Sequence, residues 1–153
     1  VSGPLQGRVG GIVVTDLSRP MLEKARRKGL TAVSAPAECL PFPDGSFDRI
    51  IIVDALHHFR CQHGAIAEMS RVLKPGGRLL VEEPDLRRMS VRAVALAERL
   101  LRMDSRFYPP DAIVGMMRQS GMSASVAATD IFRAWITGDK PGQPGSEAYR
   151  RQV

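Results

Sequence analysis

The chain has 153 residues, 44% of them hydrophobic and 25% charged, which suits one compact domain and excludes a disordered, collagen-like or coiled-coil protein. No apolar run approaches the roughly 20 residues of a membrane span, and the two cysteines, Cys39 and Cys61, make no disulfide framework, so we expect a cytoplasmic protein with no membrane partner. The net charge of +6 favours anionic partners without identifying one. Because the first residue is Val1 rather than Met, we expect the chain to be processed, truncated or incomplete.

Strand and helix patterns alternate through the first half of the chain. Short apolar runs predict four strands, at residues 11–16, 30–34, 48–54 and 78–83. We expect a helix directly after the first run, with Ser18 as its N-terminal cap, Pro20 in its first turn and Gly29 at its end. Apolar spacing between residues 65 and 73 predicts a second helix, which residues 74–77 (KPGG) should end. The alternation predicts an α/β fold whose parallel sheet is covered on both faces.

The second half of the chain has a different pattern. Residues 90–103 and 110–120 predict helices, the second of which closes at Gly121. Residues 123–137 predict two strands around a turn at Thr129 and Asp130, and so short a connection permits only antiparallel pairing. We therefore expect one reversed strand in the sheet, a single domain over residues 1–137, and a loose C-terminal extension over residues 138–153.

Three segments together resemble a known family. VVTDLSRPMLEKAR, AECLPFPDGSFDRIIIVDALHHF and AIAEMSRVLKPGGRLLVEEP are similar, in order and spacing, to the motifs of class I S-adenosylmethionine-dependent methyltransferases. The similarity covers about residues 11–84 densely and is greatest to the ubiquinone/menaquinone biosynthesis branch (methyltransferase type 11). It implies a Rossmann-like, mostly parallel sheet with one antiparallel strand near the C-terminus. It also implies S-adenosylmethionine as cofactor and methyl transfer to a small-molecule acceptor.

The resemblance implies cofactor contacts at the ends of the predicted strands. Asp16 ends the first strand, where its carboxylate can accept hydrogen bonds from the ribose hydroxyls, although a turn or cap role is the alternative. Pro36 stands where the family usually has an Asp that binds the adenine amino group, and the lost hydrogen bond, worth about 0.5–1.5 kcal/mol, should weaken binding several-fold. The residues implied to bind the cofactor are Gly3, Asp16, Leu17, Ala37, Glu38, Asp54 and Ala55.

Two histidines are the candidate catalytic residues. His57 or His58 can act as general base on a hydroxyl or amine acceptor because imidazole titrates near neutral pH. The alternative is that they are loop histidines that hydrogen-bond to their neighbours. Their spacing to Cys61 and His63 matches no standard zinc pair, so we expect no metal site. Six arginines among residues 85–106 line either the entrance for an anionic substrate or a solvated helix face.

The N-terminus departs from the family pattern. Gly3 lies only thirteen residues before Asp16, whereas about 20 residues usually separate a glycine loop from such an acid. The family's first strand and helix are therefore expected to be missing or reduced. A missing central strand leaves two unpaired edges, which preceding residues, a second chain in a homodimer, or a different closure of the fold must cover. The alternative function is thus a non-catalytic, methyltransferase-like binding or assembly subunit with weakened cofactor binding.

A nucleic-acid methyltransferase is not expected, because no base-flipping motif follows the strand that ends at Asp54.

Overall fold

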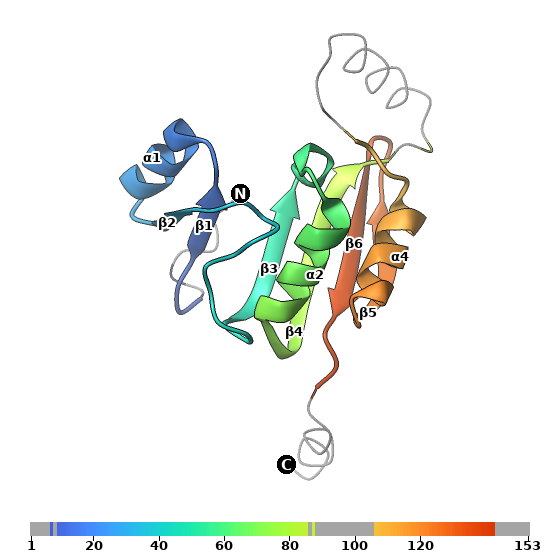
Figure 1. The fold of residues 1–153 in the computed structure, drawn as a ribbon. Helices are drawn as coiled ribbons and strands as arrows, with labels where there is room; N and C mark the ends of the chain where they lie inside the picture. Colours follow the sequence, from blue (N-terminus) through green and yellow to red (C-terminus); the bar gives the residue numbers. More distant parts are fainter. Residues whose placement is uncertain (1–6, 8, 86, 88–105, 143–153) are drawn as a thin grey trace.

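The computed structural model describes residues 7, 9–85, 87 and 106–142, and Figure 1 shows their arrangement. The elements in chain order are β1 (Val13–Asp16), α1 (Arg19–Arg27), β2 (Thr31–Ser34), β3 (Phe47–Val53), the 3-10 helix η2 (Leu56–His58), α2 (Gln62–Val72), β4 (Leu73–Pro84), α4 (Pro110–Gln119), β5 (Ser123–Thr129) and β6 (Arg133–Asp139). All four strands predicted in the first half are present, as is the helix predicted at residues 110–120. The helix predicted at residues 90–103 lies outside the described residues.

The strands form two separate sheets. β1 and β2 pair in parallel, with Asp16 opposite Ser34 at their carboxyl ends. The second sheet has the order β3-β4-β6-β5, in which β3 and β4 are parallel and β6 runs antiparallel to both of its neighbours. Among the described strands β6 is therefore the single reversed one. This confirms the prediction of a mostly parallel α/β sheet with one antiparallel strand near the C-terminus.

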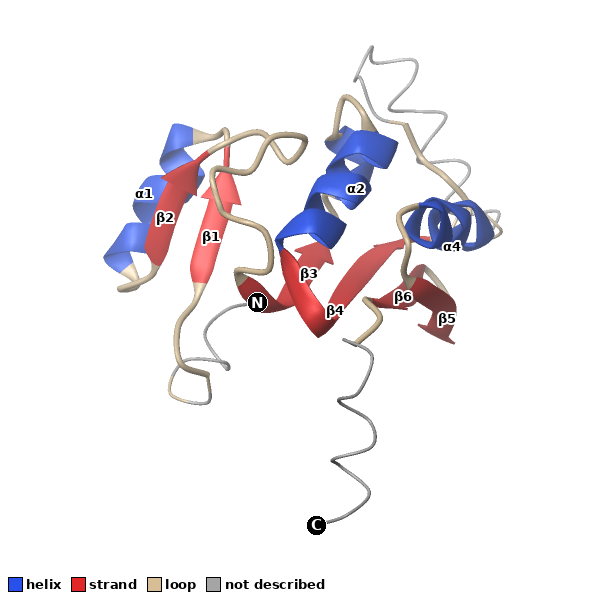
Figure 2. Cartoon of the chain, turned by 60° about the horizontal axis from the view of Figure 1, so that its bottom comes forward, coloured by secondary structure: helices blue, strands red, loops and turns tan. Residues whose placement is uncertain are grey.

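The interruption of the sheet lies between β1 and β3. Figures 1 and 2 show these two strands as neighbours that point the same way, but backbone pairing joins β1 only to β2 and β3 only to β4. Two strand edges without a partner in the described part of the chain therefore border the break, an arrangement that natural sheets usually avoid. The expectation that the family's first strand and helix are missing or reduced stays a prediction.

The local sequence accounts for α1 and corrects one expectation. Pro20 lies in the first turn, Leu22 is buried, and Gly29, with a φ of +73°, ends the segment in the left-handed conformation that glycine adopts without strain. Ser18 occupies the N-cap position, but its side chain makes no capping hydrogen bond. Its backbone N–H instead donates to Oδ1 of Asp16 at 2.8 Å, so the expected cap is replaced by an Asx turn.

β4 begins earlier than the sequence predicts. The strand starts at Leu73 instead of residue 78, because residues 74–77, expected only to end the preceding helix, belong to the strand as a bulge. Its partners on β3 move from the pair Phe47–Leu73 directly to the pair Arg49–Arg78. A Cβ on Gly77 would lie 2.8 Å from the carbonyl oxygen of Lys74, so this bulge requires a glycine.

The main hydrophobic core lies between the four-stranded sheet and the helices α2 and α4. Its fully buried side chains include Ile66 and Val72 of α2, Leu79 and Val81 of β4, and Ile136 of β6. The helix α2 packs against α4, and both lie over one face of this sheet in Figure 1. No helix among the described residues has the length and apolar character that crossing a membrane requires.

The C-terminal strand also extends past its predicted end. β6 continues to Asp139, so the first two residues assigned to the extension lie in the sheet. Arg78 of β4 binds the Asp139 carboxylate through two nitrogens, at 2.6 and 3.0 Å, and this pairing lowers the pKa of Asp139. The part of the extension from residue 143 onward lies outside the described residues.

Candidate functional site

Two of the predicted acids lie at the same edge of the broken sheet. Asp16 is the last residue of β1, and Asp54 directly follows β3. Since both strands point the same way in Figures 1 and 2, the two acids lie at carboxyl ends of strands on either side of the break. Open α/β sheets bind their ligands outside the carboxyl ends of the strands. This edge is therefore the candidate site.

Asp16 uses one carboxylate oxygen for the turn that leads into α1. Its Oδ1 accepts the hydrogen bond from Ser18, while in the described part of the chain Oδ2 accepts none. The adjacent side chain of Leu17 is 70% exposed. A half-buried carboxylate with one oxygen available, next to an exposed apolar side chain, suits a ligand with vicinal hydroxyls and an apolar ring.

The loop between β2 and β3 holds the next two predicted residues. Ala37 is half-buried and packs against the main core. The Oε1 atom of Glu38 accepts the backbone N–H of Cys61 at 3.0 Å, which fastens this loop to the start of α2. Cys61 in turn caps the helix, because its Sγ accepts the N–H of Gly64 at 3.3 Å. Glu38 thus has a structural contact in addition to its predicted role.

One arginine holds the rest of the same loop. Arg71 of α2 donates to the Glu68 carboxylate and to the carbonyl oxygens of Leu40 and Phe42, and Glu68 also accepts the N–H of Leu40. These hydrogen bonds lower the pKa of Glu68, and the charge-assisted contact with Asp44 at 2.6 Å adds a further tie. The loop that carries Ala37 and Glu38 is therefore anchored to α2 over most of its length.

The turn after β3 is organised by a carboxylate that the sequence analysis did not select. Asp54 has a φ of +51°, uncommon outside glycine, and its N–H donates to the Glu82 carbonyl at 2.9 Å. The Oε1 atom of Glu83 then accepts the N–H groups of Ala55 at 2.9 Å and Leu56 at 2.7 Å. Glu83 was not among the predicted site residues, because in the sequence it is the last residue of a predicted strand. Its position at the carboxyl end of β4, parallel to the strand before the two histidines, was the available signal.

The two candidate histidines have different environments. His57 is 5% exposed, and its Nδ1 lies 2.6 Å from Oε2 of Glu83. Its ring stacks on Phe107, with centroids 4.3 Å apart, and contacts the ring of His58 at 4.0 Å. His58 is exposed. His57 is therefore hydrogen-bonded to a neighbour, and a catalytic role for either histidine stays a prediction.

The remaining predictions fall partly outside the described residues. Gly3 and four of the six arginines lie there. Of the other two arginines, Arg87 pairs with the fully buried Asp85 at 2.8 Å, and the backbone N–H of Arg106 donates to the carbonyl of His57 at 2.8 Å. Across the described ranges, no group of three or more His, Cys, Asp or Glu side chains is arranged to hold a metal ion.

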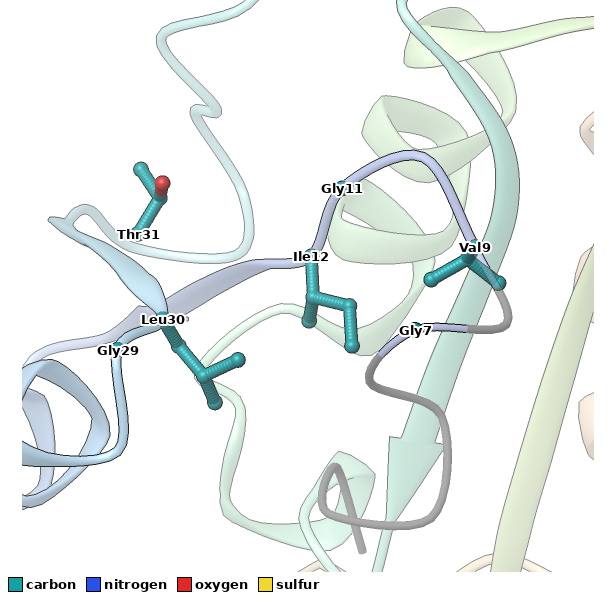
Figure 3. Close-up of a pocket in the computed structure, with 7 residues that line it drawn as sticks. All are labelled: Gly7, Val9, Gly11, Ile12, Gly29, Leu30 and Thr31. Atoms are coloured by element: carbon teal, nitrogen blue, oxygen red, sulfur yellow. The ribbon is translucent and has the colours of Figure 1, made fainter.

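A cavity of about 240 Å³ lies away from the candidate site. Figure 3 shows the residues that line it, which are Gly7, Val9, Gly11, Ile12, Gly29, Leu30 and Thr31. These segments precede β1 and begin β2, so the cavity lies at the amino ends of the strands, opposite Asp16. It brings together none of the predicted site residues.

The described elements form a Rossmann-like α/β fold, and folds of this class generally bind ligands outside the carboxyl ends of their strands. A family model described as a methyltransferase domain matches residues 1–81, which is more than half of the chain. The chain belongs to this methyltransferase family.

Individual relatives agree with that assignment. The ubiquinone/menaquinone biosynthesis C-methyltransferase UbiE of Erwinia tasmaniensis is 47% identical over 87 residues, which are 52% of this chain and 35% of the relative. The UbiE protein of Francisella tularensis subsp. novicida is 44% identical over 85 residues, 50% of this chain and 34% of the relative. The chain thus spans about a third of the length of the curated relatives it matches.

Solved structures show the same fold. The YcgJ protein of Bacillus subtilis superposes with a TM-score of 0.74 at 20% identity, over 90% of this chain and 85% of the other. A SAM-dependent methyltransferase of Thermotoga maritima, described as a possible histamine N-methyltransferase, has a TM-score of 0.74 at 23% identity, over 84% of this chain and 72% of that one.

Proposed function

We propose that this protein transfers a methyl group from S-adenosylmethionine to a small-molecule acceptor. The proposal depends on one observation in a chain of the methyltransferase family. Asp16 and Asp54 lie at the carboxyl ends of β1 and β3, the two strands that border the break in the sheet. The names of the relatives, C-methyltransferases of quinone biosynthesis, agree with it. Family membership favours this function over the alternative of a non-catalytic binding or assembly subunit.

The cofactor contacts are assigned to the predicted residues. Oδ2 of Asp16 would accept a ribose hydroxyl, Leu17 would pack on the adenine ring, and the N–H of Ala37 would donate to the base. Asp54 and Ala55 would lie beside the methionine part. Because the N–H of Ala55 is bound to Glu83 and its carbonyl to the N–H of His58, Ala55 would contribute only apolar contact. Gly3 keeps its proposed role on the sequence resemblance alone.

The protein's contribution to the reaction is mainly alignment. The sulfonium of the cofactor supplies an activated methyl group, so the site has to orient the acceptor for in-line attack and exclude water. A general base is needed only where the acceptor has to lose a proton, and we propose a histidine of η2 for this step. The Glu83 contact favours His57, and exposure leaves His58 as the second candidate.

We propose no narrower acceptor than a small, anionic molecule. Quinone precursors are the acceptor class suggested by the names of the UbiE relatives, but the chain covers only about a third of those proteins. The net charge of +6 supports an anionic acceptor. We also propose a cytoplasmic location, which the two exposed free cysteines suit, and a homodimer that covers the unpaired edges of β1 and β3.

Isothermal titration calorimetry with S-adenosylmethionine and S-adenosylhomocysteine tests the function. We expect both to bind, with an affinity reduced by the hydrogen bond lost at Pro36, and ATP is the control because it shares the adenine and ribose but not the methionine part. A transfer assay should then release S-adenosylhomocysteine in the presence of a suitable anionic acceptor. If neither S-adenosylmethionine nor S-adenosylhomocysteine binds, the proposal is overturned and the non-catalytic alternative is left.

A further inference from the structure

A buried carboxylate stands at the centre of the contacts around the proposed catalytic turn. Glu83 is 4% exposed, and its two carboxylate oxygens have different hydrogen-bond partners. Oε1 accepts two backbone N–H groups from the turn after β3, and Oε2 lies 2.6 Å from Nδ1 of His57. Its neighbour Glu82, on the other face of β4, binds Arg133 and Trp135 instead and makes none of these side-chain contacts.

We infer that Glu83 is a positioning residue: it fixes the turn that carries His57 and holds that imidazole in the tautomer with its proton on Nδ1. This inference rests on the proposed function, because it assigns a role within the same site. Nothing in the methyl-transfer proposal itself requires a carboxylate at this position, and the family match ends at residue 81, before Glu83.

The hydrogen-bond geometry specifies the tautomer. Two backbone donors fix Oε1 as an acceptor, which orients the carboxylate and directs Oε2 at the imidazole. An acceptor role of Oε2, like that of Oε1, places the hydrogen of this short contact on Nδ1. In the neutral ring, Nε2 is then the nitrogen that carries the lone pair, as a general base needs.

Aromatic contacts restrict rotation of the same ring. Phe107 stacks on His57 with an interplanar angle of 16°, and His58 packs against it at 52°. The segment that carries Phe107 is itself tied down, because Arg106 donates its N–H to the His57 carbonyl and accepts a hydrogen bond from Gln62. These two ring contacts therefore oppose flipping of the His57 ring, which would exchange the two nitrogens.

The test compares two charge-matched variants in adjacent positions of β4. In Glu83→Gln, the amide oxygen can keep the two backbone hydrogen bonds, while the NH₂ group replaces Oε2 and donates to Nδ1. We expect nitrogen-15 NMR of the ligand-free protein to show His57 protonated on Nδ1 in the wild type and on Nε2 in Glu83→Gln. The control, Glu82→Gln, should keep the wild-type tautomer. A wild-type His57 protonated on Nε2 overturns the inference without any variant.

Kinetics supply the second readout. We expect Glu83→Gln to lower kcat by about tenfold or more, because general-base catalysis contributes about 10²–10⁴-fold and the variant would lose part of it. The dissociation constant of S-adenosylmethionine and the acceptor KM should stay within about twofold of wild type. Glu82→Gln should change none of them beyond that range. Unchanged kcat in Glu83→Gln would refute the positioning role. Failure of the wild type to bind S-adenosylmethionine would refute the proposed function instead, while the tautomer result would still stand.

Discussion

The carboxylate of Asp16 accepts the backbone N–H of Ser18 at 2.8 Å, so this residue closes the turn after β1 in addition to the ribose contact proposed for its second oxygen. These two roles can be separated by substitution. We expect Asp16→Ala to lose both, and to weaken S-adenosylmethionine binding more than tenfold, since each charge-assisted hydrogen bond is worth about 1.5–3 kcal/mol. Asp16→Asn should keep the turn, with the melting temperature of the wild type, and still bind weakly. Wild-type affinity in both variants, measured by calorimetry, would remove the ribose role.

The Arg71–Glu68 pair predicts how stability depends on pH. Hydrogen bonds from Arg71 lower the pKa of Glu68 from its ordinary value of 4.5, so the pair stabilises the folded state above that pH and loses its contribution as the pH falls through the lowered value. We expect Arg71→Met to reduce stability near neutral pH and to flatten the decline below pH 4.5. Urea denaturation at a series of pH values measures both effects.

The same variant has a local readout. Because Leu40 donates its N–H to Glu68, which Arg71 orients, we expect hydrogen exchange at Leu40 to accelerate by about tenfold in Arg71→Met. The N–H of Cys61, which is bound to Glu38 of the same loop and not to Glu68, is the internal control and should change less. Equal acceleration at the two sites would show that the loop opens as a whole instead.

Three glycines predict three different outcomes for the same substitution. In Gly77→Ala the new Cβ would meet the Lys74 carbonyl at 2.8 Å, and backbone cannot easily move, so we expect a loss of about 1–3 kcal/mol. In Gly138→Ala the nearest atom, 2.9 Å away, is the flexible end of Met117, so the loss should stay below about 1 kcal/mol. Gly115→Ala, inside α4 with open space around it, should stabilise by about 0.5–1 kcal/mol. Chemical denaturation measures the free energy of unfolding of each variant, and a different order of the three values would contradict the packing argument.

The edge of β3 that has no partner strand among the described residues predicts self-association. Ile51, on this edge strand, is 45% exposed, so burying the rest of its side chain contributes roughly half of the 1.5–3 kcal/mol that full burial provides. If a homodimer covers the edge, Ile51→Lys should weaken the dimer at least about tenfold in sedimentation equilibrium. Ile131→Lys, at the 71% exposed tip between β5 and β6, is the matched control and should have no effect. A wild-type chain that sediments as a monomer at every concentration would exclude the dimer.

Features that depend on neighbouring residues in the sequence could be predicted well. Asp16 and Asp54 follow short apolar runs, and a run ending in an acid indicates both a strand and the end of the sheet at which that acid lies. Gly29 likewise identified the end of α1, because a positive φ favours glycine locally.

Features that depend on contacts between distant segments could not be predicted from the sequence. The KPGG segment is a common helix end, and only the pairing of its flanking residues, Leu73 and Arg78, with β3 makes it a bulge of β4. Glu83 reaches residues 26 to 28 positions away, so nothing next to it in the sequence indicates that its carboxylate organises the turn of His57. Ser18 is a good N-cap residue, but Asp16, two positions earlier, binds its N–H and completes the turn without the serine hydroxyl.

The interruption between β1 and β3 also divides the interior of the protein. The main core begins at Leu40 and extends to β6, whereas Leu22 and Leu30, which are buried beside β1 and β2, lie outside it. The unit of β1, α1 and β2 should therefore unfold at a lower free energy than the rest, as a separate cooperative step. A ligand that contacts Asp16 on one side and Asp54 on the other would bind only when both units are folded, and it would add its binding free energy to the weaker one. Occupancy of the site would then merge two unfolding transitions into one, which makes the methyl donor a structural crosslink as well as a reactant.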